Sequence, residues 1–138
     1  MTDIVFVHPP NTFSESYKEH ELGSNKKYGL VPPIGLLYLA SASEAKGFSV
    51  KIIDSLALGI GLEDTIKLIG QEHPYILGIS ATTYQSRAAV QLSKKIKEEF
   101  GNNMSVCLGG AHISSKPDFI KNFSYFNFGI IGEININT

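Results

Sequence analysis

Residues 75–110 read YILGISATTYQSRAAVQLSKKIKEEFGNNMSVCLGG, and their pattern indicates the fold class. Residues 75–80 and 104–108 are short apolar runs that we expect to be strands. Between them, four apolar residues recur at every fourth position, opposite a charged face: Ala88, Leu92, Ile96 and Phe100. This period predicts a helix that ends at Gly101. A strand, a helix and a strand in this order indicate a right-handed crossover between parallel strands.

The same alternation extends to both sides of this unit. Further strands are predicted at residues 4–7, 50–54 and 128–131, and further helices at 33–46, at 62–72 and, shorter, from Pro117. The first strand lacks polar and apolar alternation, which is typical of a strand buried on both faces. Five strands that alternate with four helices predict an α/β fold. We expect a doubly wound, Rossmann-like (flavodoxin-like) parallel five-stranded sheet with helices on both faces.

Length and composition limit what this chain does. Its 138 residues suit one domain, residues 1–138, and 43% hydrophobic residues allow a substantial core. Twelve Lys and Arg against thirteen Asp and Glu leave no broad basic surface, so no nucleic-acid partner is expected. The single Cys107 rules out an intrachain disulfide, and we expect no iron–sulfur cluster in this chain.

A membrane location is not expected either. The most apolar stretch, residues 30–42, contains two prolines and falls short of the roughly 20 residues that cross a bilayer. Met1, Thr2 and Asp3 provide no positively charged start for a secretory signal, so we expect a cytoplasmic protein.

The carboxyl ends of parallel strands meet on one rim, where α/β sheets bind ligands. The predicted rim segments are residues 8–11, 54–59, 80–84, 109–113 and 132–133. The connection 8–32 is far longer than the usual strand-to-helix loop of about 2 to 6 residues. This connection belongs to the ligand edge, where it is either a lid or binding loop or a flexible insertion.

The first rim segment argues against a dinucleotide. Such a site needs G-x-G-x-x-G after the first strand, because the pyrophosphate binds bare backbone amides. Here His8, Pro9, Pro10 and Asn11 follow that strand, and the two prolines remove two N–H donors. Asp54, placed like a ribose-binding acid, is therefore expected to be structural or to cap a loop.

Two other rim segments predict one continuous cleft. Ser80, Thr82 and Thr83 supply hydroxyls that either cap the next helix or hold a polar ligand. Gly109 and Gly110 either make a tight turn or let a flat ligand approach the backbone. Neighbouring strands carry these two features, so a ligand could contact both.

The rim histidines, His8 and His112, are candidate metal ligands, but neither has an acid close in sequence. We therefore expect no metal site. Ser80 has no acid-supported histidine near it in sequence, and Cys107 lies inside a strand, where a thiol more often packs than reacts. No catalytic residues are predicted.

In order and spacing, six blocks resemble one known family almost end to end. They are VHPP (7–10), PPIGLLYLA (32–40), ID (53–54), GISATT (78–83), LGGAH (108–112) and IGE (131–133). The chain resembles the cobalamin (vitamin B12)-binding domain that precedes the radical S-adenosylmethionine (SAM) domain in cobalamin-dependent radical SAM enzymes.

This resemblance implies cobalamin as cofactor, with its dimethylbenzimidazole tail between two loops. Ser80 and Thr82 would hydrogen-bond the tail, and Gly109 and Gly110 would leave room for it. The full set of implied cofactor-binding residues is His8, Pro9, Pro10, Ser80, Thr82, Thr83, Gly109, Gly110, His112, Gly132 and Glu133.

Two departures from the wider family refine the expectation. The wider family has a D-x-H-x-x-G motif after the first strand, and this chain has none there. Residues 54–59 have the Asp and the Gly of that motif, but they have Leu56 in place of the His and they follow the second strand. The resemblance therefore implies base-off, His-off binding, with His112 ordering its loop. The family continues after Gly132 and Glu133 into Gly-Glu and a cluster domain, whereas this chain reads Ile134-Asn135.

The expected function is thus the cofactor-binding module of a radical SAM methyltransferase or related enzyme. The chain as it stands is not expected to be an enzyme, and a radical SAM domain is its expected partner. Two alternatives stay open. One is a ligand-free Rossmann-like interaction domain, and the other is a flavin- or nucleotide-binding flavodoxin-like domain, supported by fold alone.

Overall fold

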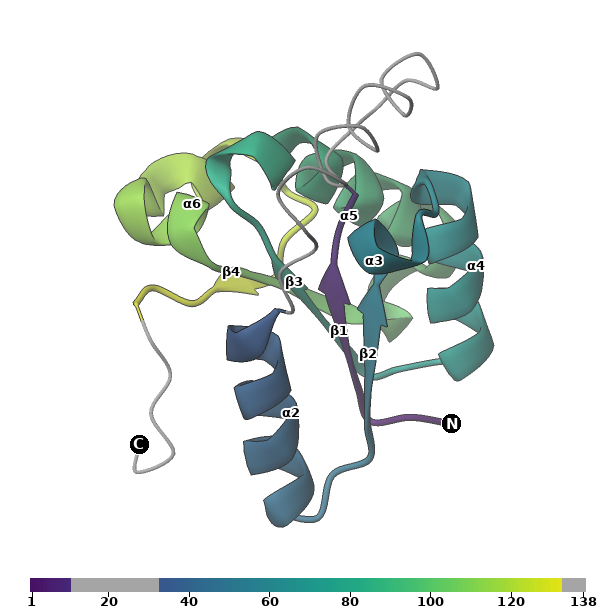
Figure 1. The fold of residues 1–138 in the computed structure, drawn as a ribbon. Coiled ribbons are helices and arrows are strands. Elements are labelled where there is room, and N and C mark those ends of the chain that lie inside the picture. Colours follow the sequence, from purple (N-terminus) through teal and green to yellow (C-terminus); the bar gives the residue numbers. More distant parts are fainter. Residues whose placement is uncertain (11–32, 133–138) are drawn as a thin grey trace.

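The computed structural model describes residues 1–10 and 33–132, and its five strands form a parallel sheet in the order β2-β1-β3-β4-β5 (Figure 1). The strands are β1 (Ile4–His8), β2 (Val50–Asp54), β3 (Ile76–Ser80), β4 (Ser105–Gly109) and β5 (Phe128–Gly129). The α-helices are α2 (Ile34–Ala45), α3 (Ser55–Leu58), α4 (Leu62–Glu72), α5 (Ser86–Phe100) and α6 (Ala111–Ser115). Three 3-10 helices complete the described elements: η1 (Thr83–Gln85), η2 (Gly101–Asn103) and η3 (Pro117–Asn122). The predicted α/β fold class is confirmed.

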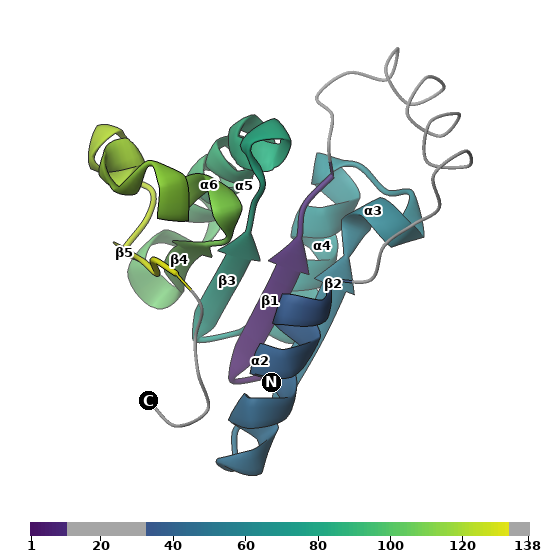
Figure 2. The same ribbon diagram turned by 60° about the vertical axis from the view of Figure 1, so that its left-hand side comes forward.

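Helices cover the two faces of the sheet unequally. In Figure 2, α2 lies over β1 and β2 on one face, while α4 and α5 lie behind the sheet. The chain adds β2 on one side of β1 and β3 on the other, so the direction of winding reverses between β1 and β3. In doubly wound sheets, ligands bind outside the carboxyl ends of the strands at such a reversal.

The main core lies on the α4 and α5 face. Alternate strand residues point there, among them Val5, Leu77 and Val106, and each is fully buried. Leu92 and Ile96 of α5 pack against them. Because side chains alternate along a strand, the residues between these positions point to the α2 face.

The α2 face carries a smaller core. Phe6 of β1 packs against Leu36 and Ala40 of α2, and all three are buried. Ile4 and Ile52 extend this cluster toward β2. On this face, the described apolar packing is therefore concentrated over β1 and β2, beneath α2.

Most predicted elements are confirmed, with small shifts at their ends. The period of α5 holds, and Gly101 (φ 60°) follows its last residue and donates its N–H to the Lys97 carbonyl. The fifth strand is wrong in length, since pairing to β4 stops at Gly129. The helix from Pro117 is a 3-10 helix, and α6 before it was missed because five residues are too few to show a helical period.

Within residues 1–10 and 33–132, no helix combines the length and apolarity needed to cross a bilayer. Most of the long connection 8–32 lies outside the described residues, as does Glu133.

Candidate functional site

An apolar groove of about 800 Å³ is lined by residues of α2 and of the sheet, and so lies on the α2 face, beside the part of the sheet that α2 covers. Phe6, Gly78 and Cys107 are paired neighbours in the sheet register and form one row of its floor. Ser80 and Gly109, also paired, lie two residues further along β3 and β4, at the rim. The groove thus ends at the edge where ligands of α/β proteins bind.

The groove is open because the strands beneath it carry small residues. A Cβ at Gly78 would lie 2.8 Å from Cδ1 of Phe6, so glycine is what lets this ring lie across β3. Ile34 and Tyr38 of α2 also line the groove and are about half or more exposed. A flat apolar group would find an aromatic ring below it and a helix beside it.

Cys107 places a thiol in the groove floor. The residue is 6% exposed, and burial raises the pKa of the thiol to about 11. The thiol therefore stays protonated and neutral near pH 7, which suits packing better than nucleophilic chemistry. Its place in a strand was predicted, but its exposure to a groove was not.

The two glycines after β4 serve different needs. Gly110 has φ 100°, and a Cβ there would lie 2.8 Å from the carbonyl oxygen of Ala81. The Ala81 N–H donates to the Gly109 carbonyl, and the Ala81 carbonyl accepts from the His112 N–H, so the β3 and β4 loops are bonded directly. Gly109 has ordinary backbone geometry and open space where its side chain would stand.

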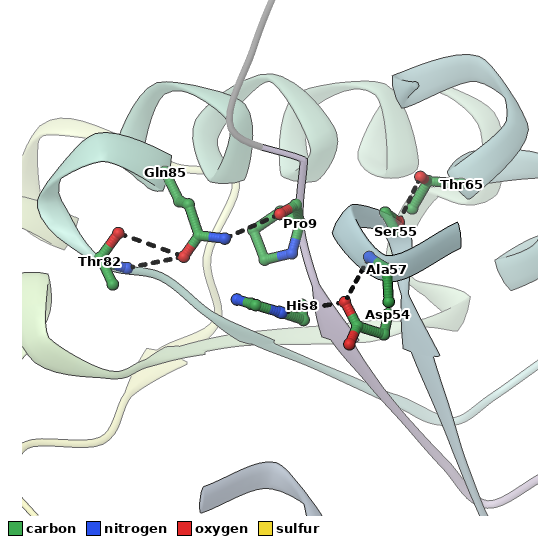
Figure 3. Close-up of polar contacts among 8 residues, drawn as sticks. All are labelled: His8, Pro9, Asp54, Ser55, Ala57, Thr65, Thr82 and Gln85. Carbon is green, nitrogen blue, oxygen red and sulfur yellow. Dashed lines mark hydrogen bonds and ion pairs between the residues drawn. The ribbon is translucent and has the colours of Figure 1, made fainter. Parts of the chain in front are cut away.

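The hydroxyls after β3 divide between two roles. Ser80 lines the groove. Thr82 caps η1: its N–H and its hydroxyl both donate to Oε1 of Gln85, at 3.1 and 3.3 Å. The amide nitrogen of Gln85 donates in turn to the Pro9 carbonyl at 2.8 Å (Figure 3). Sequence reasoning missed Gln85, because its partner lies 76 positions away.

His8 is held by a carboxylate. Its Nδ1 lies 3.0 Å from Oδ1 of Asp54, which also accepts the N–H of Ala57 at 3.1 Å (Figure 3). The predicted capping role of Asp54 is confirmed. The expectation that no acid lies near His8 holds only along the sequence, since parallel pairing of β1 with β2 places the two residues side by side. With Nδ1 at Asp54, the other ring nitrogen of His8, Nε2, lies on the side toward Thr82 (Figure 3).

His112 joins the β4 loop to the β3 loop. It is 5% exposed, its Nδ1 lies 3.3 Å from the Thr83 hydroxyl, and its ring meets that of Phe119 edge to face with centroids 4.3 Å apart. Burial first, and the nearby Lys116 second, lower the pKa of the imidazole. Its Nε2 is buried and has no hydrogen-bond partner among the described residues. The neutral form is therefore favoured.

The predicted site residues fall into two described groups. Those that line the groove are Ser80, Gly109, Gly110 and Gly132. Those that tie the surrounding loops together are His8, Pro9, Thr82, Thr83 and His112. Pro10 is buried beside them, and Glu133 lies outside the described residues. Within residues 1–10 and 33–132, no three His, Cys, Asp or Glu side chains gather into a metal site.

Comparisons with known proteins identify the family of this chain. The model of the B12 binding domain family matches residues 24–135. An uncharacterized methyltransferase of Pyrococcus horikoshii is 39% identical over 90 residues, which are 63% of this chain and 18% of that protein.

Two solved structures share the fold. A novel cobalamin-binding protein from Desulfitobacterium hafniense superposes with a TM-score of 0.64 at 16% identity, over 94% of this chain and 52% of that one. The radical SAM methyltransferase TsrM from Kitasatospora setae gives 0.58 at 17% identity, over 89% of this chain and 22% of that one. This chain thus spans about half of one of these proteins and about a fifth of the two methyltransferases. With most of its length matched by the family model, the chain belongs to the B12-binding domain family.

Proposed function

We propose that this chain binds cobalamin base-off and His-off and places the nucleotide tail of the cofactor in the groove on the α2 face. The observation that carries the proposal is the open, apolar groove between Ser80 and Gly109 at the rim of a B12-binding domain. The alternative of a flavin or nucleotide binder gains no support from this rim, where Pro9 and Pro10 lack N–H donors.

The groove fits the chemistry of the tail. A benzimidazole is flat and apolar, and the described floor offers Phe6 and Cys107 together with the bare backbone of Gly78. The Ser80 hydroxyl and the half-buried backbone at Gly109 are the polar groups that would meet the ring or its ribose. A volume of about 800 Å³ lies within the usual range of ligand pockets.

The enclosure of His112 supports His-off binding. His112 is enclosed by its contacts with Thr83 and Phe119, and exposing its ring would require opening the β4 loop. The pairing of His8 Nδ1 with Asp54 joins the ends of β1 and β2 and would leave Nε2 available to a metal. We therefore base His-off binding on His112 and propose that His8 orders its loop, an assignment that the spectrum of the cobalt(II) complex tests.

When bound, the cofactor would supply the group-transfer chemistry, because the cobalt of a corrinoid can carry a methyl group. The residues of this chain contribute a shaped apolar groove, a hydroxyl at its rim and a set of loops tied together by hydrogen bonds. This chain matches about a fifth of two methyltransferases. We propose that it serves a radical SAM methyltransferase or related enzyme as its non-catalytic cofactor module, in the cytoplasm.

The test is retention of the cofactor. The purified chain is incubated with hydroxocobalamin, desalted and examined by absorption spectroscopy, with circular dichroism to show that it is folded. We expect a retained corrinoid with a base-off spectrum. A folded chain that retains no corrinoid contradicts the proposal.

A matched variant, Gly109→Leu, tests the location. Because Gly109 has ordinary geometry and open space around it, the leucine side chain enters the groove without straining the backbone. We expect this variant to fold and to lose cobalamin. If it retains as much corrinoid as the wild-type chain, the tail does not occupy the groove.

A further inference from the structure

Gln85 is a buried amide that joins the ends of two strands, and the proposed function does not use it. The residue is 2% exposed. Its Oε1 accepts the N–H and the hydroxyl of Thr82, just beyond β3, and its Nε2 donates to the Pro9 carbonyl at 2.8 Å, just beyond β1 (Figure 3). One side chain thus spans the point where the winding of the sheet reverses.

These contacts require an amide. At one end the side chain must accept hydrogen bonds, and at the other end it must donate one. An ionised glutamate of the same shape keeps the acceptor but sets a second negative oxygen against the Pro9 carbonyl. A methionine of similar length provides neither function. A buried carbonyl that loses its donor is costly, so either change should shift the Pro9 and Thr82 segments apart.

The segments joined by Gln85 carry groups of the proposed cofactor site. Ser80, at the rim of the groove, lies two residues before Thr82. Ala81 between them accepts and donates the backbone hydrogen bonds that place the Gly109 and Gly110 loop. On the other side, Pro9 directly follows His8. A shift at Gln85 would therefore reach the mouth of the groove through Ser80 and through the Gly109 and Gly110 loop.

We propose that Gln85 is a positioning residue of the cofactor site: its amide sets the spacing between the end of β1 and the Ser80–Thr82 segment, and thereby the shape of the groove mouth. This inference rests on the proposed cobalamin binding. If Gln85 has this role, replacing it should weaken cobalamin binding more than a core substitution of similar effect on stability does.

The test compares Gln85→Glu and Gln85→Met with the wild-type chain by titration with hydroxocobalamin between pH 5 and pH 8. At pH 8 we expect both variants to bind about tenfold more weakly, the loss that follows from breaking one buried hydrogen bond. As the pH falls, the glutamate takes up a proton and regains a donor for Pro9, so its affinity relative to wild type should recover. The methionine variant should stay weak throughout.

Ile96→Val provides the control for general destabilisation. Ile96 is fully buried in α5, in the core face of the same helix that follows Gln85, and lies away from the groove. We expect this variant to lower the thermal midpoint without weakening cobalamin binding. The inference is overturned if Gln85→Glu binds as wild type at pH 8, if its loss does not change with pH, or if Ile96→Val weakens binding equally. A folded wild-type chain that binds no cobalamin overturns the proposed function and this role with it, whereas normal wild-type binding with unchanged variants overturns only the role of Gln85.

Discussion

The two faces of β3 and β4 use the same strands for different purposes. On the α4 and α5 face, successive inward positions carry large apolar side chains that are at most 1% exposed: Leu77, Ile79, Val106 and Leu108. On the α2 face, the intervening positions carry small residues: Gly78, Ser80, Cys107 and Gly109. One face is packed, and the other borders the groove.

This difference teaches how a small domain reconciles stability with an open site. Large side chains bury apolar area and stabilise the fold, whereas glycines and small residues contribute little burial and leave space. A ligand in the groove would supply the missing contacts. Because it would bind the folded chain and not the unfolded chain, it would stabilise the fold.

The largest expected effect is on the packed face. Leu108→Ala removes a fully buried side chain from the main core and should lower the free energy of unfolding by about 2–5 kcal/mol. Cys107→Ala, its neighbour on the groove face, should cost less than about 1 kcal/mol, because the groove already leaves space beside it. Urea denaturation of both variants measures the difference. Equal losses would show that both faces are packed alike.

Cys107 also reports on the groove through its reactivity. With its pKa raised to about 11, the thiol should react with iodoacetamide at pH 8 about a hundredfold more slowly than the urea-unfolded chain does. The rate should rise about tenfold per pH unit up to that pKa, and bound hydroxocobalamin should slow it further. Mass spectrometry follows the reaction at this single cysteine. A rate that cobalamin leaves unchanged would argue against a tail lying on Cys107.

The two rim glycines should differ in what they cost the fold. Gly110→Ala forces a side chain into a backbone of φ 100° and against the Ala81 carbonyl, and should cost about 1–3 kcal/mol of stability. Gly109→Ala meets neither obstacle and should change stability by about 0.5 kcal/mol or less. Thermal and urea unfolding compare the pair. If Gly109→Ala lowered stability as much as Gly110→Ala, a side chain at position 109 would have to clash with packed atoms, contrary to the open space seen there.

His112 should make the fold sensitive to acid. Its folded-state pKa is lowered from 6.5, so its contribution is fully present above that value and is lost as the pH falls through the folded-state pKa. His112→Phe should therefore flatten the decline in stability between pH 7 and pH 5. His73→Asn, at an exposed histidine, serves as the control. An unchanged slope in His112→Phe would mean that this imidazole titrates as freely as a surface one.

The smallest effect is expected at His8. If cobalamin binds His-off, the electron paramagnetic resonance spectrum of the Co(II) complex should show no nitrogen ligand, and His8→Ala should leave it unchanged. Affinity should change by no more than about 1 kcal/mol, the usual worth of a partly exposed pair such as His8–Asp54. A nitrogen splitting that disappears in His8→Ala would instead make His8 a cobalt ligand.

Local patterns account for what could be predicted. The four-residue period of α5 survives intact because one helix face packs on the sheet along its length. The runs of apolar residues locate the strands, and the residues that follow them lie on the rim. The five-residue α6 carries too little pattern to be recognised, and the two-residue β5 was recognised but predicted too long.

Contacts between distant segments account for what was missed. The pairing of His8 with Asp54 depends on the register of β1 and β2, across 46 positions. In the sequence, Gln85 is one polar residue near the start of a helix. In the structure, its amide nitrogen donates a hydrogen bond to the Pro9 carbonyl. Cys107 was expected to pack, and it is buried, but its place in the floor of a groove depends on α2 packing over β1 and β2 rather than over β4.

The amino-acid sequence by itself determined the α/β class, the succession of strands and helices and the segments that reach the ligand rim, because periodicity and chain order are local properties. Only the tertiary structure decided which side chains meet there. The order β2-β1-β3-β4-β5 and the placement of α2 leave small residues beside a groove and bring Gln85 to Pro9. These relations depend on how helices pack on a sheet and on strand register, and neither follows from any one segment.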